Sequence, residues 1–396
     1  MPVLLALALL QAVQRPDYTR DLDALLADLK ADGAYVRDDG VDFAKLDAAY
    51  RPRFAGAKDR TALLRVLEAF VEELHDFHAF VGSNDGHSPR TVPSGTDLRG
   101  EWRGERAFVR EVRPDSLLSE AGIRAGDEIL QVGERAVREA ARGWFGVLPP
   151  GSRGWDWALD QALAARWDET RELHFSRDDV EETVSLPTAR EEPPGPLLDV
   201  KDLPNGLILL RPRNSLGDTA TIAEIDAARP RLLKAKGIML DLRDTPSGGN
   251  TAVARGLMGV FLDRRMPYQR HLVEERATGT VRDWVEYATP RGISPLNAPM
   301  VVLVDAWTGS MGEGIAVGLD AMRRATVVGT RMAGLRGAVG ASELPVSGYR
   351  VFFPIERLYT PNLVPRHEWL PPVRITPGPG DPWLAKALAL LNLPKR

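Results

Sequence analysis

Ser310 lies between a continuous apolar stretch and a helix-like stretch, in the segment DAWTGSMGEGIAVGLDAMRRATVVGT (residues 305–330). The apolar run that ends at Asp305 predicts a buried strand, and the residues from Met311 onward predict a helix. A serine at a helix N-terminus suits a nucleophile, because the unpaired N–H groups and the helix dipole favour developing negative charge. The N–H of Met311 could then bind an oxyanion. The position equally suits an ordinary N-cap serine, and Thr308 breaks the G-x-S-x-G pattern of α/β-hydrolases.

A second turn of this type occurs in GIMLDLRDTPSGGN (residues 237–250), where a buried strand leads through a polar, glycine-rich loop into a helix. Gly248 and Gly249 permit close approach of the backbone to a ligand. Two strand–loop–helix units can place two N–H donors around one carbonyl oxygen. Two ordinary strand-to-helix turns are the alternative interpretation.

These two segments together resemble the C-terminal-processing and tricorn-type serine peptidases of family S41. The resemblance rests on LDLRDTPSGGN for the family's strand and glycine loop, and on Ser310, Gly312 and Glu313 for its nucleophile motif. RATVVGT (residues 324–330) is similar to the strand that follows in the family. The likeness extends from about residue 17 to the end of the chain. It implies a nucleophile at Ser310 and an oxyanion hole formed by Met311 with a glycine of the pair Gly248 and Gly249.

The resemblance also indicates the general base. The branch of the family with a Ser/Lys dyad keeps its lysine roughly 25 residues after the serine, where this chain has Leu335. The neighbouring Arg336 cannot replace it, because a guanidinium is not deprotonated in proteins. The segment VEELHDFHAFVG (residues 71–82) instead resembles the histidine segment of the tricorn-like branch, with His78 as the base and Asp76 as the family aspartate. Histidine suits this role because its pKa lies near neutrality.

A third member of the site should orient His78. PRHEWLPPVRI (residues 365–375) resembles the family segment that carries this acid, with Glu368 in its place and Val373 in place of an aspartate. The adjacent His367 is expected to be structural or exposed. Glu313 is expected to support the start of the helix rather than the chemistry.

Two alternatives for the histidines stay open. His75 and His78 are three residues apart and could bind a metal ion from one helical face, although no third ligand is recognisable. They could also be helix-end surface residues or satisfied core histidines. The resemblance itself implies neither a metal nor an organic cofactor.

Between the histidine segment and the glycine loop, the chain changes to short strands. Residues 17–82 predict helices, and the tract 83–98 is rich in Gly, Ser, Pro and Asp, which indicates a linker or an exposed loop. AGIRAGDEIL (residues 121–130) then resembles a PDZ domain, a fold that binds an extended peptide as an added strand, commonly at its C-terminus. The tract 189–196 predicts a second boundary.

Beyond that boundary, apolar strand-like runs alternate with helical stretches, which predicts an α/β unit with buried strands. The expected fold class is therefore α/β, with a ClpP/crotonase-like core, an N-terminal helical region and an inserted PDZ-like β domain. The expected boundaries are as follows: a possible signal peptide at 1–16, the helical region at 17–90, the PDZ-like domain at 95–188 and the peptidase core at 197–396.

Composition narrows the function classes. The 396 residues carry a net charge of −4 and contain no cysteine, so thiol nucleophiles, disulfides and cysteine-bound zinc are excluded. Nothing suggests a nucleic-acid partner, and the apolar start (residues 3–10) is too short to cross a membrane but resembles a secretory leader. We expect a periplasmic or otherwise exported serine endopeptidase that acts on polypeptides, which a PDZ-like domain commonly binds at their C-termini. The alternatives are a catalytically inactive binding relative on the same fold, and a crotonase-like acyl-CoA enzyme.

Overall fold

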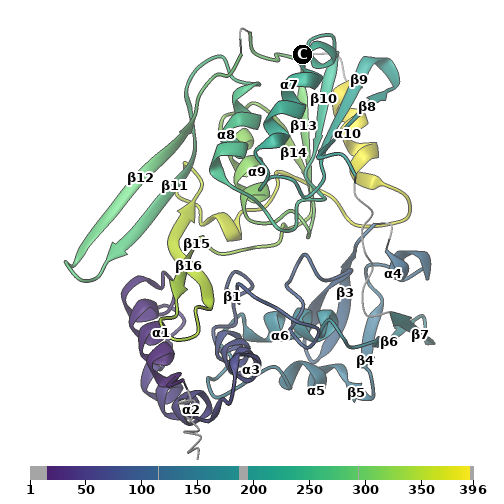
Figure 1. The fold of residues 1–396 in the computed structure, drawn as a ribbon. Coiled ribbons are helices and arrows are strands. Elements are labelled where there is room, and N and C mark those ends of the chain that lie inside the picture. The colour runs from purple at the N-terminus through teal and green to yellow at the C-terminus, as the bar shows by residue number, and fades with distance from the viewer. Residues whose placement is uncertain (1–15, 115, 187–194, 293, 393–396) are drawn as a thin grey trace, which may run out of the picture.

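The computed structural model describes residues 16–114, 116–186, 195–292 and 294–392. Figure 1 shows two bodies, one above the other: an upper α/β core, and a lower body in which the N-terminal helices lie beside a small β domain. The expected signal peptide and most of the boundary tract 189–196 lie outside the described residues. None of the described helices is both long and apolar enough to cross a membrane.

The N-terminal region is helical, as its three- and four-residue apolar spacing predicts. Its helices are α1 (Thr19–Asp32), α2 (Phe43–Gly56) and α3 (Arg60–Glu72). Asp59 caps α3, because its carboxylate accepts a 2.8 Å hydrogen bond from the N–H of Ala62. The helix ends at Glu72, so the residues from 75 to 78 form a loop rather than a helical face.

An antiparallel β domain with short helices follows, and we call it the β2–β7 domain. Its strands follow the sheet order β2-β3-β4-β6-β7, with β5 paired to β4. The strands are β2 (Leu98–Arg103), β3 (Arg106–Val112), β4 (Glu128–Val132), β5 (Arg135–Ala136), β6 (Arg171–Arg177) and β7 (Val180–Leu186), and the helices are α4 (Leu117–Glu120), α5 (Val137–Arg142) and α6 (Gly154–Ala164). The glycine–aspartate turn precedes β4, where the Asp127 carboxylate accepts the Arg124 N–H at 2.9 Å.

The upper core is built on a sheet of order β17-β14-β13-β10-β9-β8, which is parallel except at the β8–β9 pair. Its strands are β8 (Leu198–Leu203), β9 (Leu207–Pro212), β10 (Gly237–Asp241), β13 (Met300–Val304), β14 (Thr326–Gly329) and β17 (Val373–Arg374). Its helices are α7 (Ala220–Leu232), α8 (Thr251–Gly259), α9 (Met311–Ala321) and α10 (Pro382–Asn392), with short 3-10 turns η1 (Pro204–Gly206) and η2 (Arg366–Glu368).

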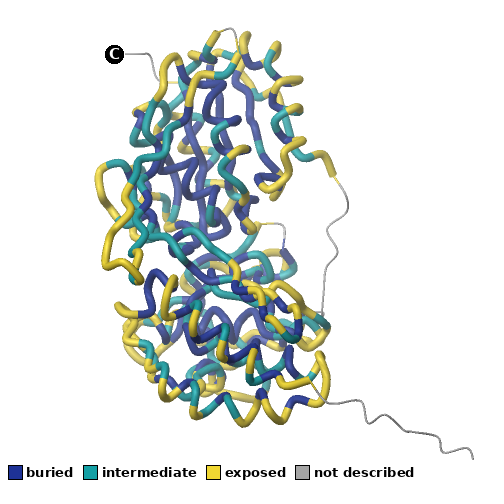
Figure 2. The backbone as a smooth tube through the Cα atoms, turned by 60° about the vertical axis from the view of Figure 1, so that its left-hand side comes forward, coloured by how far each residue is buried: buried dark blue, intermediate teal, exposed yellow. Residues whose placement is uncertain are grey.

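Every residue of β10 and β13 is buried, which confirms the prediction of fully buried strands. The reason is that both faces of the sheet are covered. One face packs against α7, α8 and α9, and the other packs against α10 through Trp383 and Ala387. Figure 2 shows this buried interior as the dark part of the upper body.

A third sheet, which the sequence patterns did not indicate, joins the two bodies. It has the order β1-β16-β11-β12, with β15 paired to β16. Its strands are β1 (Phe80–Val81), β11 (Met266–Glu275), β12 (Thr280–Ala288), β15 (Ala338–Glu343) and β16 (Arg350–Tyr359). Because β1 pairs with β16 through Phe80 and Phe352, it ties the histidine segment just before it to the core. Figure 1 also shows the β11–β12 hairpin extending away from the core.

The tract 83–98 is exposed in its first part, at Ser83, Asn84, Gly86 and His87, as its composition predicted, but most of its later part is covered. Ser88, Arg90, Val92 and Thr96 are all buried. The polar groups of this tract are satisfied by neighbours that are distant in sequence, such as the carbonyl of Ala165, which accepts the Arg90 N–H at 2.9 Å. Glycine, serine and proline here produce an irregular backbone, but the packing of the β2–β7 domain against the rest of the chain covers its later part.

Candidate active site

Ser310 occupies the turn between β13 and α9, as predicted, in an unusual backbone conformation. Its φ is 46° and its ψ is −105°, a region that non-glycine residues rarely adopt. Its side chain makes no capping hydrogen bond to α9, in contrast to Asn250, whose side chain caps α8. The hydroxyl is therefore not used as an N-cap. Strained backbone of this kind is concentrated at functional sites.

The glycine pair lies directly against Ser310. A Cβ atom added to Gly248 would fall 2.4 Å from the Cβ of Ser310 and 3.0 Å from both its Oγ and the nitrogen of Met311. Gly248 also has a φ of 65°, so both space and backbone conformation require glycine here. The two turns that the sequence singled out separately are thus one site.

The N–H groups of this site divide into two kinds. The N–H of Gly248 donates to the carbonyl of Thr245 at 3.0 Å, which closes the turn. In the described part of the chain, neither Gly249 nor Met311 donates a backbone hydrogen bond to the surrounding turns. Of the three residues predicted for an oxyanion hole, Gly249 and Met311 therefore have an N–H to offer, and that of Gly248 is already engaged.

The strand register explains why these turns meet. β10 and β13 are parallel neighbours, with Asp241 opposite Leu303, so the loops after them leave the same edge of the sheet. Beyond the strands, the Thr245 carbonyl also accepts the Gly309 N–H at 3.1 Å, and Thr245 pairs with Thr308 in an isolated bridge. The serine turn is held against the glycine loop by these backbone contacts.

Glu313 fixes the start of α9, as expected, but it does more. It is fully buried, and its carboxylate accepts the N–H groups of Gly334 at 2.9 Å and Leu335 at 3.3 Å. Burial raises the pKa of Glu313 to about 7, which the nearby Arg366 opposes. One carboxylate therefore links the serine turn to the loop at 334–335.

Leu335 lies beside the nucleophile turn. Its Cδ1 is 3.4 Å from where a Cβ on Gly309 would be, and the residue is buried. Its apolar side chain cannot transfer a proton, so Leu335 itself is not a base.

His78 is buried in the loop between α3 and β1 and is hydrogen-bonded to the same loop of the core. Its Nδ1 lies 2.7 Å from the carbonyl oxygen of Arg336, and its main-chain N–H donates to Asp76 Oδ1 at 2.9 Å. A carbonyl only accepts, so the neutral ring carries its proton on Nδ1 and its lone pair on Nε2. Burial lowers the pKa of His78, against the raising effects of the Arg336 carbonyl and Asp76. No hydrogen bond between the described atoms joins His78 to Ser310.

Glu368 does not meet His78 in this structure. It lies in η2 with a side chain that is 61% exposed, and its carboxylate is 3.6 Å from the Nε2 of His367. His367 is largely buried against the ring of Tyr35, and its pKa is lowered to about 3 by burial. Its Nδ1 has no hydrogen-bond partner among the described residues. The predicted orienting acid and the predicted base are therefore not in contact.

The described residues do not support a metal centre. His75 has a φ of 46° in the loop after α3, so it does not share a helical face with His78, which corrects the basis of that alternative. Its ring packs against Phe145 and Trp157. Within the described ranges, no group of three or more histidine or acidic side chains is placed to hold a metal ion.

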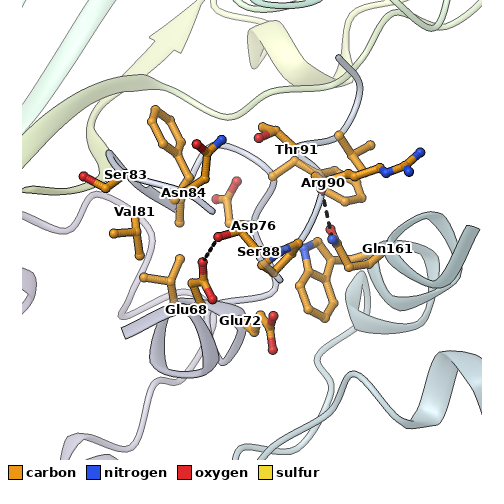
Figure 3. Close-up of a pocket in the computed structure, with 17 residues that line it drawn as sticks. Glu68, Glu72, Asp76, Val81, Ser83, Asn84, Ser88, Arg90, Thr91 and Gln161 are labelled. Carbon is orange, nitrogen blue, oxygen red and sulfur yellow. Dashed lines mark hydrogen bonds between the residues drawn. The ribbon is translucent and has the colours of Figure 1, made fainter. Parts of the chain in front are cut away.

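A pocket lies on the other side of the histidine loop (Figure 3). It is lined by residues of α3, the loop at 76–92 and α6, including Glu68, Glu72, Asp76 and Gln161, and has a volume of about 620 Å³ with its mouth included. Burial raises the pKa of Glu72 to about 7. Neither Ser310 nor His78 lines this pocket, so it is separate from the reacting groups.

The β2–β7 domain contacts the serine turn directly. Arg99 donates to the carbonyl of Ala306 at 3.3 Å, and the Glu111 carboxylate accepts the Thr330 hydroxyl at 2.7 Å. Glu111 and Arg99 are both buried. The candidate site is therefore assembled at the junction of the two bodies in Figure 1.

Part of the chain matches a known family of peptidases. Residues 217–373, which hold both turns, match the model of peptidase family S41. A search of the curated proteins finds no match. Among solved structures, the photosystem II D1 C-terminal processing protease aligns over 91% of this chain and 93% of its own, at 20% identity and a TM-score of 0.58.

Two other solved structures are similar over comparable lengths. Mature CPAF in complex with lactacystin aligns over 91% of this chain and 94% of its own, at 15% identity and a TM-score of 0.59. A peptidase of Parabacteroides merdae aligns over 95% and 97%, at 13% identity and a TM-score of 0.58. At such identities the likeness establishes a shared mixed α/β fold.

The family match and the site indicate a serine peptidase. Residues 217–373, the part of the chain that carries both turns, match peptidase family S41.

Proposed function

We propose that this protein is a serine endopeptidase in which Ser310 is the nucleophile and His78 the general base. The observation that carries the proposal is the geometry of Ser310. Its backbone is strained, its hydroxyl is not used as a helix cap, and the glycine pair lies against it. An ordinary N-cap serine needs none of these features.

The reaction follows from the positions of donors and acceptors. Nε2 of His78 takes the proton of Ser310 Oγ while Oγ bonds to the peptide carbonyl carbon. The N–H groups of Met311 and Gly249 bind the oxyanion. His78 then gives the proton to the departing amine, and a water molecule that His78 deprotonates releases the acyl group. Glu368 is retained as the predicted orienting acid only if peptide binding brings it to His78.

This reaction needs the imidazole within hydrogen-bond reach of Ser310 Oγ, roughly 2.6–3.2 Å. We infer that bound substrate completes this approach, since catalytic hydrogen bonds often tighten only in the complex. Nothing in the scheme requires a metal or an organic cofactor. The crotonase-like alternative does not account for the unengaged hydroxyl of Ser310.

The domain roles belong to the same proposal. We infer that residues 95–188 form a PDZ-like domain that binds an extended polypeptide, possibly at its C-terminus, and that residues 197–396 form a ClpP/crotonase-like core. The Gly-Asp turn before β4 supports the first inference, and the mostly parallel sheet with helices on both faces supports the second. The apolar N-terminal residues support export.

Labelling with a fluorophosphonate probe tests the chemistry. We expect labelling of the wild type and its loss in Ser310→Ala and His78→Ala. Ser247→Ala is the matched control, because Ser247 lies in the glycine loop but bonds to Asn214. His87→Ala, at a side chain that is 75% exposed, is the control for the histidine. Folded wild type that stays unlabelled, with and without added peptide, would instead indicate a catalytically inactive binding relative.

A further inference from the structure

Arg336 makes a set of contacts around His78 that the proposed reaction does not by itself explain. Its Nε bonds to Asp76 Oδ2 at 2.7 Å, while its two terminal nitrogens bond to the two oxygens of Asp39 at 3.0 and 2.6 Å. The main-chain carbonyl oxygen of Arg336 lies 2.7 Å from Nδ1 of His78 and accepts its hydrogen bond. Asp76 also receives the main-chain N–H of His78. The histidine is therefore held at its backbone and at its ring by two residues that are bonded to each other.

Burial makes this arrangement rigid. Arg336, Asp76 and His78 are all buried, and the guanidinium lies over the ring of Tyr35 at 4.5 Å. Asp39 is the outermost member, with a side chain that is 36% exposed. A buried guanidinium between two carboxylates has its donors directed by both, so its main chain has little freedom to move.

The same short loop reaches the nucleophile on its other side. The N–H groups of Gly334 and Leu335 are bonded to Glu313, which lies in the first turn of α9, three residues after Ser310. One residue later, the Arg336 carbonyl holds His78. Three consecutive residues thus connect the serine turn to the histidine, and the side chain of the third is anchored to the N-terminal region through Asp39.

We propose that Arg336, anchored by Asp39 and Asp76, is the positioning residue that sets the tautomer and the orientation of His78. This inference rests on the proposed function, in which His78 is the base. In this arrangement the main-chain carbonyl of Arg336 orients the His78 ring, which is the role that the sequence analysis predicted for Glu368. Arg336 touches neither substrate nor the reacting atoms, and it acts through His78.

A pair of neighbouring aspartates provides the test. Asp39 anchors Arg336, whereas Asp38 pairs with Arg357, which lies over the same Tyr35 ring at 5.2 Å. We expect Asp39→Asn to lower kcat on a peptide substrate by about tenfold to a hundredfold, with little change in KM, since small misplacements of a catalytic group have effects of this size. Asp38→Asn should leave kcat unchanged, and Asp39→Glu should restore part of the loss.

A spectroscopic measurement separates positioning from activity. The chain has six histidines, so ¹⁵N-histidine NMR, with His78→Ala for assignment, can report the tautomer of His78. The wild type should show the proton on Nδ1, and Asp39→Asn should show a mixture of tautomers, with unchanged circular dichroism. Both aspartate variants behaving alike, or an unchanged tautomer in Asp39→Asn, would overturn the inference. If Asp39→Asn changes the tautomer of His78 but the wild type has no peptidase activity, the positioning role of Arg336 is supported and only the proposed function is refuted.

Discussion

The indole Nε1 of Trp307 donates a 2.8 Å hydrogen bond to the carbonyl oxygen of Thr96. Both residues are fully buried, and 211 positions separate them in the chain. Trp307 lies in the turn that leads to Ser310, and Thr96 lies just before β2. The loop that enters the β2–β7 domain is therefore hydrogen-bonded to the turn that carries the nucleophile. Loss of this hydrogen bond should alter the position of Ser310.

Trp307→Phe should destabilise the protein. The substitution leaves the buried Thr96 carbonyl without this donor, and such an unsatisfied group costs about 1–3 kcal/mol. Thermal unfolding measures the effect. Trp167→Phe is a suitable control, because the Trp167 Nε1 has no hydrogen-bond partner among the described residues. Equal shifts of the unfolding temperature in the two variants would mean that the Trp307–Thr96 hydrogen bond does not contribute to stability.

Gly248→Ala should abolish or strongly reduce labelling of Ser310. The added Cβ would fall 2.4 Å from the serine Cβ, and the φ of 65° is unfavourable for alanine. We expect a loss of kcat of at least about tenfold, because the added methyl group would push the glycine loop away from Ser310 and displace the nucleophile. Gly217→Ala places its Cβ in open space and should retain activity. Full activity of Gly248→Ala would show that the glycine loop is not part of the site.

The pH profile of kcat/KM should retain activity below the ordinary titration range of histidine. Burial lowers the pKa of His78 from its usual 6.5, and the reaction needs the neutral ring, so the active form persists to lower pH. The acid limb should therefore fall below pH 6.5 and should be absent from the residual activity of His78→Ala. An acid limb above 6.5 would contradict the assignment of His78 as the base.

The stability of the protein should decrease as the pH rises toward 7. Burial raises the pKa of Glu111 to about 7, and that of Asp305 is also raised, by burial and by the charge of Glu111. The native state thus holds protons that the unfolded chain releases from about pH 4.5, so the stabilisation is complete below that value and is lost as pH rises through the native pKa.

Glu111→Gln isolates this effect. The amide keeps an acceptor for the Thr330 hydroxyl but does not ionise, so the variant should lose less stability than wild type between pH 5 and 8, by roughly 1–3 kcal/mol. Urea unfolding at several pH values measures the difference. Glu105→Gln, at a side chain that is 78% exposed, should follow the wild-type curve. Parallel curves for wild type and Glu111→Gln would exclude Glu111 as the titrating group.

The sequence alone determined the parts of the site that depend on neighbouring residues. The apolar runs predicted β10 and β13, the positions after them predicted α8 and α9, and Ser310 and the glycine pair followed from the turns between. These features are local, because a buried strand, a glycine turn and a helix start are each specified within about ten residues.

The tertiary structure decided which distant groups meet. The sequence indicated His78 but gave no sign that its ring would bond to the Arg336 carbonyl, 258 positions away, or that Asp39 would anchor that arginine. It predicted Glu368 for that place. It also predicted a linker or exposed loop over the whole of 83–98, where Ser88 and Thr96 are in fact buried, because composition indicates backbone preference and not which other residues pack against the backbone. Ion-pair partners and burial are set by the packing of whole domains, and no local pattern in the chain encodes that packing.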